Sequence, residues 1–153
     1  LRPICGDGVN FVNAPVLAKE RGIRVLAGTE DDTGYQGGWL EARVTAESGA
    51  SHRVAGAFFG RHPRIVLIDD VHLDLAPTGA LILTRHHDRP GVVGHLGTIL
   101  GRHAVNIRRI ELGPGGDSRL ASGFLALYDE PPAGVLDEIA ALPDVESVHL
   151  VHL

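Results

Sequence analysis

Apolar and polar residues alternate along much of the first half of the chain, with the period of two that is typical of β-strands. Within residues 39–47 every second position is apolar, at Leu40, Ala42, Val44 and Ala46. Part of residues 52–59 alternates in the same way, and the small polar segment 48–51 between the two predicts a hairpin turn. A further apolar run at residues 65–68 predicts another strand. The first half is therefore expected to be rich in strands.

The start of the chain carries the signals of one short helix. Asn13-Ala14-Pro15 predicts a helix that continues to about Arg21, where Gly22 closes it. Residues 23–28 then predict a strand, and residues 30–38, rich in Asp and Gly, predict a loop. This half is therefore expected to mix one helix with several strands.

A cluster of breaker residues, Ala76-Pro77-Thr78-Gly79, follows the acidic stretch 69–74, which ends a hydrophobic run. Such clusters lie between structural units because they favour turns over regular elements. We expect two domains, a partial, strand-rich α+β domain at 1–76 and a second domain at 77–153.

The second half has a regular order of elements. Strand, helix, strand, strand, helix and strand are predicted at residues 80–85, 92–103, 105–112, 120–128, 131–142 and 145–153, with a hairpin loop at 113–117. The predicted buried stripes of the helices are Val93, Leu96, Leu100 and His103, then Val135, Leu136, Ile139 and Leu142. This order predicts an α+β, ferredoxin-like βαββαβ domain, with both helices on one face of a four-stranded antiparallel sheet. Its open edge strands favour pairing with a second copy.

Composition narrows the range of partners. The chain has 153 residues, of which 44% are hydrophobic, and a formal net charge of −5, so we expect neither a nucleic acid nor a membrane as partner. The chain has a single cysteine, Cys5, which fits the reducing environment of the cytoplasm. No histidine or helix N-terminus is identifiable beside Cys5, so the sequence does not favour it as a nucleophile. The chain begins at Leu1 and has no methionine, so we expect it to be a fragment of a longer polypeptide.

Residues 86–91, His-His-Asp-Arg-Pro-Gly, separate a predicted strand from a predicted helix that begins at Pro90 and Gly91. The first N–H groups of a helix lack partners within it and, with the helix dipole, attract a carboxylate. Asp88 supplies a negative charge for an ammonium group, and Asn106, at the head of the next strand, offers a donor and an acceptor. The pattern predicts a receptor for a small amino acid. On spacing alone it is more typical of an ordinary helix cap, in which Asp88 binds no ligand.

Other chemistry finds less support in the sequence. The spacing Gly91-x-x-Gly94-x-x-Gly97 differs from the dinucleotide-binding pattern, so no nicotinamide cofactor is expected to bind this chain. The nine histidines invite a metal site, but the pairs His86-His87 and His149-x-x-His152 point to opposite faces of a strand, so no metal site is expected. A small enzyme built on the acidic stretch stays open, because strand alternation places Asp70, His72 and Asp74 on one face, with Asp69 beside them. An acidic strand end beside a linker is also commonly only solvated.

The segment from Asp88 to Gly94, followed by Val105-Asn106-Ile107, resembles the ACT domain, a small regulatory module that binds amino acids between paired copies. The first half, with Phe11-Val12-Asn13-Ala14-Pro15 and residues 54–60, resembles the intervening regulatory domain of the long form of D-3-phosphoglycerate dehydrogenase. The resemblance covers the whole chain. It implies that catalytic and nucleotide-binding domains, with their NAD, precede Leu1 in the parent enzyme, and that this part has no catalytic residues.

The resemblance also implies the ligands. It implies L-serine as the feedback ligand of the second domain, with its carboxylate at Pro90 to Val92, its ammonium group at Asp88 and Asn106, and its hydroxyl at His86 or Asn106, across a subunit interface. For the first domain it implies a site for phosphate or a phosphorylated substrate, at which Arg64 and His72 match while Val71 and Ala76 carry no charge.

Two further readings remain open at this stage. One is the regulatory part of an L-serine dehydratase, which the Asn-Ala-Pro segment disfavours. The other is a free-standing amino-acid sensor or transcription-factor domain, which the acidic charge and the lack of a helix-turn-helix pattern disfavour.

Overall fold

A computed structural model describes residues 8–10, 12–24, 39–114 and 119–153. The chain divides into two compact units, residues 1–34 and 35–153. In the first unit the predicted helix is confirmed as α2 (Ala14–Glu20), with Pro15 in its first turn. Ile23 and Arg24 have no regular structure, and the rest of the predicted strand 23–28 and loop 30–38 lies outside the described residues.

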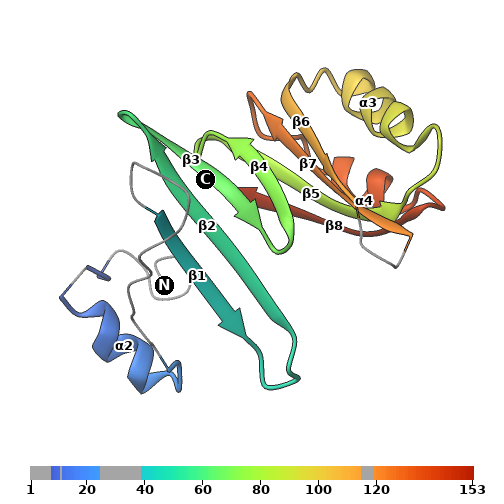
Figure 1. Ribbon diagram of the computed structural model, residues 1–153. Helices are drawn as coiled ribbons and strands as arrows, with labels where there is room; N and C mark the ends of the chain where they lie inside the picture. Colours follow the sequence, from blue (N-terminus) through green and yellow to red (C-terminus); the bar gives the residue numbers. More distant parts are fainter. Residues whose placement is uncertain (1–7, 11, 25–38, 115–118) are drawn as a thin grey trace. The chain divides into compact units, whose positions relative to one another are not determined.

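The described part of the second unit begins with an antiparallel sheet (Figure 1). Its order is β1-β2-β3-β4, formed by β1 (Trp39–Thr45), β2 (Ser51–Phe59), β3 (His62–Ile68) and β4 (Val71–Leu75). The alternating pattern predicted β1, β2 and the hairpin turn between them, and the apolar run at 65–68 predicted β3. Strand β4 was not predicted: its segment was assigned to an acidic stretch, although Val71, Leu73 and Leu75 alternate and are buried.

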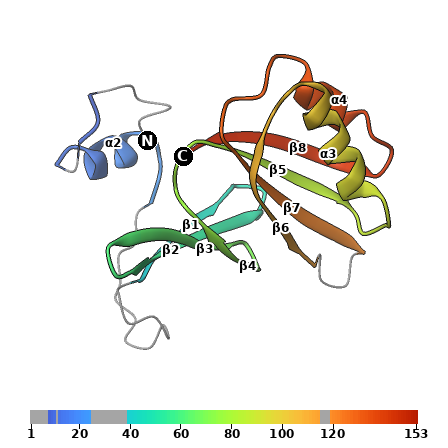
Figure 2. The same cartoon turned by 90° about the horizontal axis from the view of Figure 1, so that it is seen from above.

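Residues 80–152 form the predicted ferredoxin-like unit. The elements are β5 (Ala80–His87), α3 (Val92–Arg102), β6 (Ile107–Gly113), β7 (Leu120–Leu127), α4 (Val135–Ala140) and β8 (Val145–His152). The sheet order β6-β7-β5-β8 is antiparallel throughout and confirms the predicted α+β fold. Helices α3 and α4 lie together on one side of this sheet (Figure 2). Most of the loop predicted at 113–117 lies outside the described residues.

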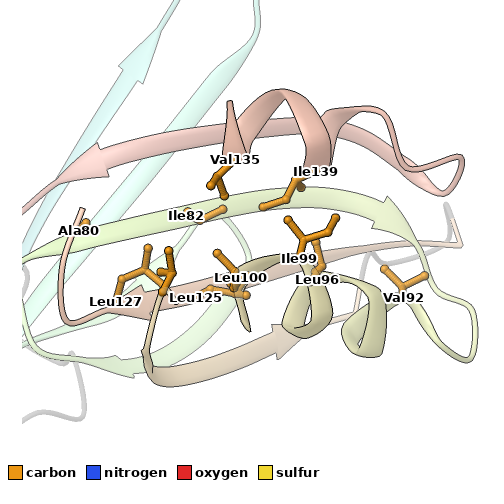
Figure 3. Close-up of a cluster of buried hydrophobic side chains, with 11 residues drawn as sticks. Ala80, Ile82, Val92, Leu96, Ile99, Leu100, Leu125, Leu127, Val135 and Ile139 are labelled. Carbon is orange, nitrogen blue, oxygen red and sulfur yellow. The ribbon is translucent and has the colours of Figure 1, made fainter. Parts of the chain in front are cut away.

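The helices and the sheet enclose one apolar core (Figure 3). It includes Ile82 of β5, Leu125 and Leu127 of β7, and Val135 and Ile139 of α4. The buried residues of α3 are Val92, Leu96, Ile99 and Leu100. The predicted stripe of α3 was partly wrong, since Val93 is 37% exposed and His103 ends the helix at the surface. The rotation of a helix about its axis is set by what it packs against, so its buried face can differ from the predicted one.

The other face of β5 and β7 packs against the first sheet. Leu81 and Phe124 form a second core with residues of β3 and β4, which are Ile65, Val71, Leu73 and Leu75. A β-bulge in β3 lies between Ile65 and Leu67 and changes which side chains face this core. Strand β6 approaches β4 closely at Gly113, where a Cβ atom would lie 2.3 Å from Cγ1 of Val71. Glycine at 113 therefore lets β6 approach β4.

We expect Gly113→Ala to destabilise residues 39–153 by about 1–3 kcal/mol, because valine is stiff and the added methyl overpacks the contact. Urea denaturation of the variant measures this loss. In the double variant with Val71→Ala, the total should be smaller than the sum of the two single losses.

Gly101→Ala is the matched control, because a Cβ atom at residue 101 meets nothing within 4 Å and alanine favours the helix. Equal effects of Gly113→Ala and Gly101→Ala would contradict the close approach of β6 to β4.

Candidate functional site

The predicted ligand site lies where β5 ends and α3 begins. Helix α3 starts at Val92, as the apolar pattern predicted, and its N-cap residue is Gly91 with φ of 98°. This left-handed conformation suits glycine, so Pro90 and Gly91 form the approach to the helix rather than its first turn. No side chain caps the helix. Asp88 therefore does not act as an ordinary cap, which was the alternative interpretation of this pattern. The Val92 N–H donates to the Arg89 carbonyl at 3.4 Å, and the next N–H groups of the first turn point out of the helix end.

The loop that carries Asp88 is fixed at both of its sides. The Asp88 N–H donates to the Arg119 carbonyl at 3.0 Å, and His87 donates to the Asp144 carbonyl at 2.8 Å. The Arg89 guanidinium forms an ion pair with Asp144 at 2.8 Å. The backbone of this loop is thus anchored to the neighbouring turns, while Asp88 itself is exposed to solvent. An exposed carboxylate on a fixed backbone is suited to pair with a ligand cation.

His86 lies on the same face of β5 as Ile82, the face that the helices cover, and is only 3% exposed. Its Nδ1 atom is 3.0 Å from the His87 carbonyl oxygen. Its Nε2 atom is buried and has no hydrogen-bond partner among the described residues. The structure thus places His86, Asp88, Pro90, Gly91 and Val92 at one end of the ACT-like sheet.

Asn106 lies at the opposite end of that sheet. Its carbonyl accepts a hydrogen bond from the Tyr128 N–H at 3.1 Å, just past the end of β7, whereas Asp88 bonds to Arg119, just before the start of β7. The eight residues of β7 separate the two points, which at about 3.3 Å per residue is roughly 25 Å. One small ligand therefore cannot contact Asp88 and Asn106 of the same chain.

Arg64 and His72, the residues predicted to hold an anion, lie on the neighbouring strands β3 and β4. The guanidinium of Arg64 on β3 is 3.4 Å from the carboxylate of Asp74 on β4. His72 pairs with Leu67, three residues along β3 from Arg64. The second cation near Asp74 is instead Arg109 of β6, at 3.5 Å, and Arg109 also contacts Glu111 at 2.6 Å. The hydrogen bond to Glu111 raises the pKa of Arg109. The only sequence signal for Arg109 was the basic pair 108–109 with Glu111 two residues further along the same strand.

The acidic residues proposed for a small enzyme pair with different basic residues. Asp69 is 3.1 Å from Nδ1 of His52, Asp70 is 3.1 Å from Arg53, and Asp74 lies between two arginines. These contacts are those of structural ion pairs. Across the described ranges, no three His, Cys, Asp or Glu side chains gather as metal ligands would, and no helix is long and apolar enough to cross a bilayer. Cys5 lies outside the described residues.

A charged cluster joins the two helices of the ferredoxin-like unit. Glu138 of α4 forms ion pairs with Arg102 and with His103, whose Nε2 atom is 2.8 Å from the carboxylate. The hydrogen bond from His103, followed by the charge of Arg102, lowers the pKa of Glu138 below its ordinary value of 4.5. The cluster fastens the end of α3 to α4.

The lowered pKa predicts a specific loss of stability in acid. Because folded Glu138 binds its proton less tightly than unfolded Glu138, its contribution is fully present above pH 4.5 and disappears as the pH falls through the folded value. Glu138→Gln should therefore flatten the decline of unfolding free energy between about pH 5 and pH 3, measured by urea denaturation. Glu47→Gln, in the turn after β1, is the control and should keep the wild-type slope. An unchanged slope in Glu138→Gln would contradict the role of this carboxylate.

Comparison with known proteins agrees with this architecture. Residues 1–69 match the D-3-phosphoglycerate dehydrogenase intervening domain, and residues 80–144 match the ACT domain. D-3-phosphoglycerate dehydrogenase of Methanocaldococcus jannaschii is 32% identical over 157 residues, covering 100% of this chain and 29% of that protein. D-3-phosphoglycerate dehydrogenase of Synechocystis is 34% identical, and the match covers 96% of this chain and 26% of that protein. D-3-phosphoglycerate dehydrogenase of Mycobacterium tuberculosis is 32% identical, and the match covers 96% of this chain and 28% of that protein. Among solved structures, the ACT domain from GTP pyrophosphokinase of Chlorobium tepidum covers 47% of this chain and 95% of its own, at 17% identity and a TM-score of 0.39.

The βαββαβ unit is an ACT domain. The chain as a whole corresponds to the C-terminal regulatory region of D-3-phosphoglycerate dehydrogenases, in which intervening-domain sequence precedes the ACT domain. It spans less than a third of the length of the curated relatives it matches. These relatives favour that family over the serine dehydratase alternative. The domain boundary after residue 76 falls between the two family matches and stays a prediction.

Proposed function

We propose that this chain is the regulatory region of a D-3-phosphoglycerate dehydrogenase and that its ACT domain binds L-serine for feedback control. The observation that carries the proposal is the uncapped start of α3 beside the exposed carboxylate of Asp88, at the end of the ACT sheet. The serine carboxylate bonds to the N–H groups of the first turn that follow Val92, because the Val92 N–H itself donates to the Arg89 carbonyl at 3.4 Å. Asp88 pairs with the ammonium group. Both charges of a free amino acid thereby find an opposite partner.

A second copy of the chain completes the site. Strand β6 is an edge of the ACT sheet, and Ile110 and Leu112 along it are 38% and 51% exposed. If two copies join their β6 edges antiparallel, the strand direction reverses, so Asn106 of one copy comes to the sheet end that holds Asp88 of the other. One ligand can then contact Asp88 of one copy and Asn106 of the other, although these residues lie roughly 25 Å apart within one chain. This arrangement makes self-association part of the proposed function.

The catalytic part of the proposed enzyme, with its NAD-binding domain, belongs to sequence outside this chain. The relatives support this division, because the chain covers only 26–29% of those named above. We place the enzyme in the cytoplasm, in keeping with a chain that has a single cysteine. Under this proposal serine alters the rate of a distant reaction only through a difference in its affinity for two arrangements of the paired chains.

Isothermal titration calorimetry tests the ligand. L-serine should bind the wild-type chain, and Asp88→Ala should weaken binding by about 10- to 100-fold, the effect of removing a charged hydrogen-bond partner. Asp137→Ala, which removes an exposed carboxylate from α4 of the same domain, should leave the affinity unchanged. Absence of heat with wild type, or equal affinity in wild type and Asp88→Ala, would refute the proposal.

Mixing two variants that bind serine poorly tests whether two copies of the chain share one binding site. Asp88→Ala and Asn106→Ala should each bind serine poorly alone. After the two are unfolded and refolded together, mixed pairs carry one site with both residues intact, so serine binding should return to a fraction of the chains. If the two residues act within one chain, no mixture would regain binding.

A further inference from the structure

One face of strands β1 and β2 is lined by apolar side chains that are open to solvent. The register of the two strands places Ala42 opposite Val54 and Leu40 opposite Gly56, and alternate residues of each strand share a face. The members of this face, which we call the β1–β2 apolar face, are Leu40, Ala42, Val44, Val54 and Phe58. Leu40 is 77% exposed and Val44 is 70% exposed.

The sequence of β1 is that of a strand with one buried face. Its other face carries Glu41, Arg43 and Thr45, of which the first two form an ion pair at 3.2 Å. Apolar residues on one side and polar residues on the other are typical of antiparallel strands that cover a core on one side only. Leu40 and Val44 lie on the side that such a strand buries. The pattern therefore indicates that a partner covers the β1–β2 apolar face.

The β1–β2 apolar face continues the core that lies between the two sheets. Val54 pairs with Ile68 and Gly56 with Ile65, and both isoleucines pack into the core that the first sheet shares with β5 and β7. The ACT sheet thus covers this side of the first sheet at β3 and β4 and leaves it open at β1 and β2. An apolar element laid over β1 and β2 would extend the same core across the whole first sheet.

The size of the face decides between kinds of partner. Two strands of seven and nine residues, at about 3.3 Å per residue and about 4.8 Å between strands, present roughly 250 Å². Separate proteins that associate stably bury about 800 Å² each. The face alone is therefore too small to hold a second copy of the chain. An element of the same polypeptide needs less area, because its tether gives it a high effective concentration.

We propose that the β1–β2 apolar face is the docking surface for a segment of the same polypeptide that lies outside this chain. This inference rests on the proposed function, in which the catalytic and NAD-binding part of the enzyme belongs to such sequence. The relatives support a partner of this kind, because the chain spans only 26–29% of the length of those named above.

The chemistry of the face defines the docked segment. The positions of β1 and β2 on this face carry no Lys, Arg, Asp or Glu. The segment therefore presents apolar side chains rather than charges. Once docked, it shares one core with the ACT sheet through Ile65 and Ile68, so the two are in contact through packed side chains.

Cysteine labelling tests the proposal by comparing this chain with the full-length enzyme. In a background with Cys5→Ser, Val44→Cys should react rapidly with a maleimide in the chain alone, because residue 44 is exposed there. In the full-length enzyme it should react at least about tenfold more slowly, measured by mass spectrometry of the peptide that carries residue 44. Thr45→Cys, on the opposite face of β1, is the matched control and should keep its rate.

Two results would overturn the inference. Equal labelling of Val44→Cys in the chain and in the full-length enzyme would show that nothing docks on the face. Slow labelling in the chain alone would show that a second copy, or another part of this chain, covers it. Calorimetry with L-serine on the same samples reports on the ligand separately: protection of residue 44 without serine binding would refute the serine proposal alone.

Val44→Asp gives an independent measure, because a carboxylate buried without a partner is destabilising. It should lower the melting temperature of the full-length enzyme and leave that of the chain alone nearly unchanged. Equal losses in both would also contradict the docking.

Discussion

The central strands of the ACT sheet, β5 and β7, are buried on both faces, and this two-sided burial constrains the rest of residues 39–153. On one face Ile82, Leu125 and Leu127 pack against α3 and α4. On the other, Leu81 and Phe124 pack against β3 and β4. Because successive side chains of a strand point to opposite faces, one short segment of sequence holds together three layers of structure. A change in the position of β5 therefore affects both cores.

Contacts made by β6 also connect the proposed ligand site with the first sheet. Two arginines that follow Asn106, Arg108 and Arg109, contact residues outside β6. Arg108 donates to the Thr78 carbonyl at 2.7 Å, in the connection before β5, and Arg109 pairs with Asp74 of β4. Gly113, at the other end of β6, approaches Val71. Strand β6, the edge proposed to join a second copy, thus contacts β4 of the first sheet at Arg109 and at Gly113, and we expect pairing of copies to act on that sheet through these contacts.

Much of this fold was predictable from local pattern. The helix after Asn13, the strands of the first sheet up to Ile68 and the βαββαβ order all follow from hydrophobic period and from breaker residues. Strand β4 was missed because it has only five residues and carries His72 and Asp74 on its exposed side. Its burial comes from β5 and β7, which are distant in sequence. The stripe of α3 was partly misassigned for a related reason, since Val92 and Ile99, rather than Val93 and His103, face the sheet.

The sequence by itself determined the elements, their order and the chemical types gathered around residues 86–91, because these depend on neighbours a few positions away. Only the tertiary structure decided which side chains lie close together in space. It separated Asn106 from Asp88 by the length of β7, placed the Asp74 carboxylate within ion-pair distance of both Arg64 and Arg109, and set the Thr84 hydroxyl beside His86 over Gly123. Strand register and sheet packing set these distances, and both arise from contacts between segments that no local pattern connects.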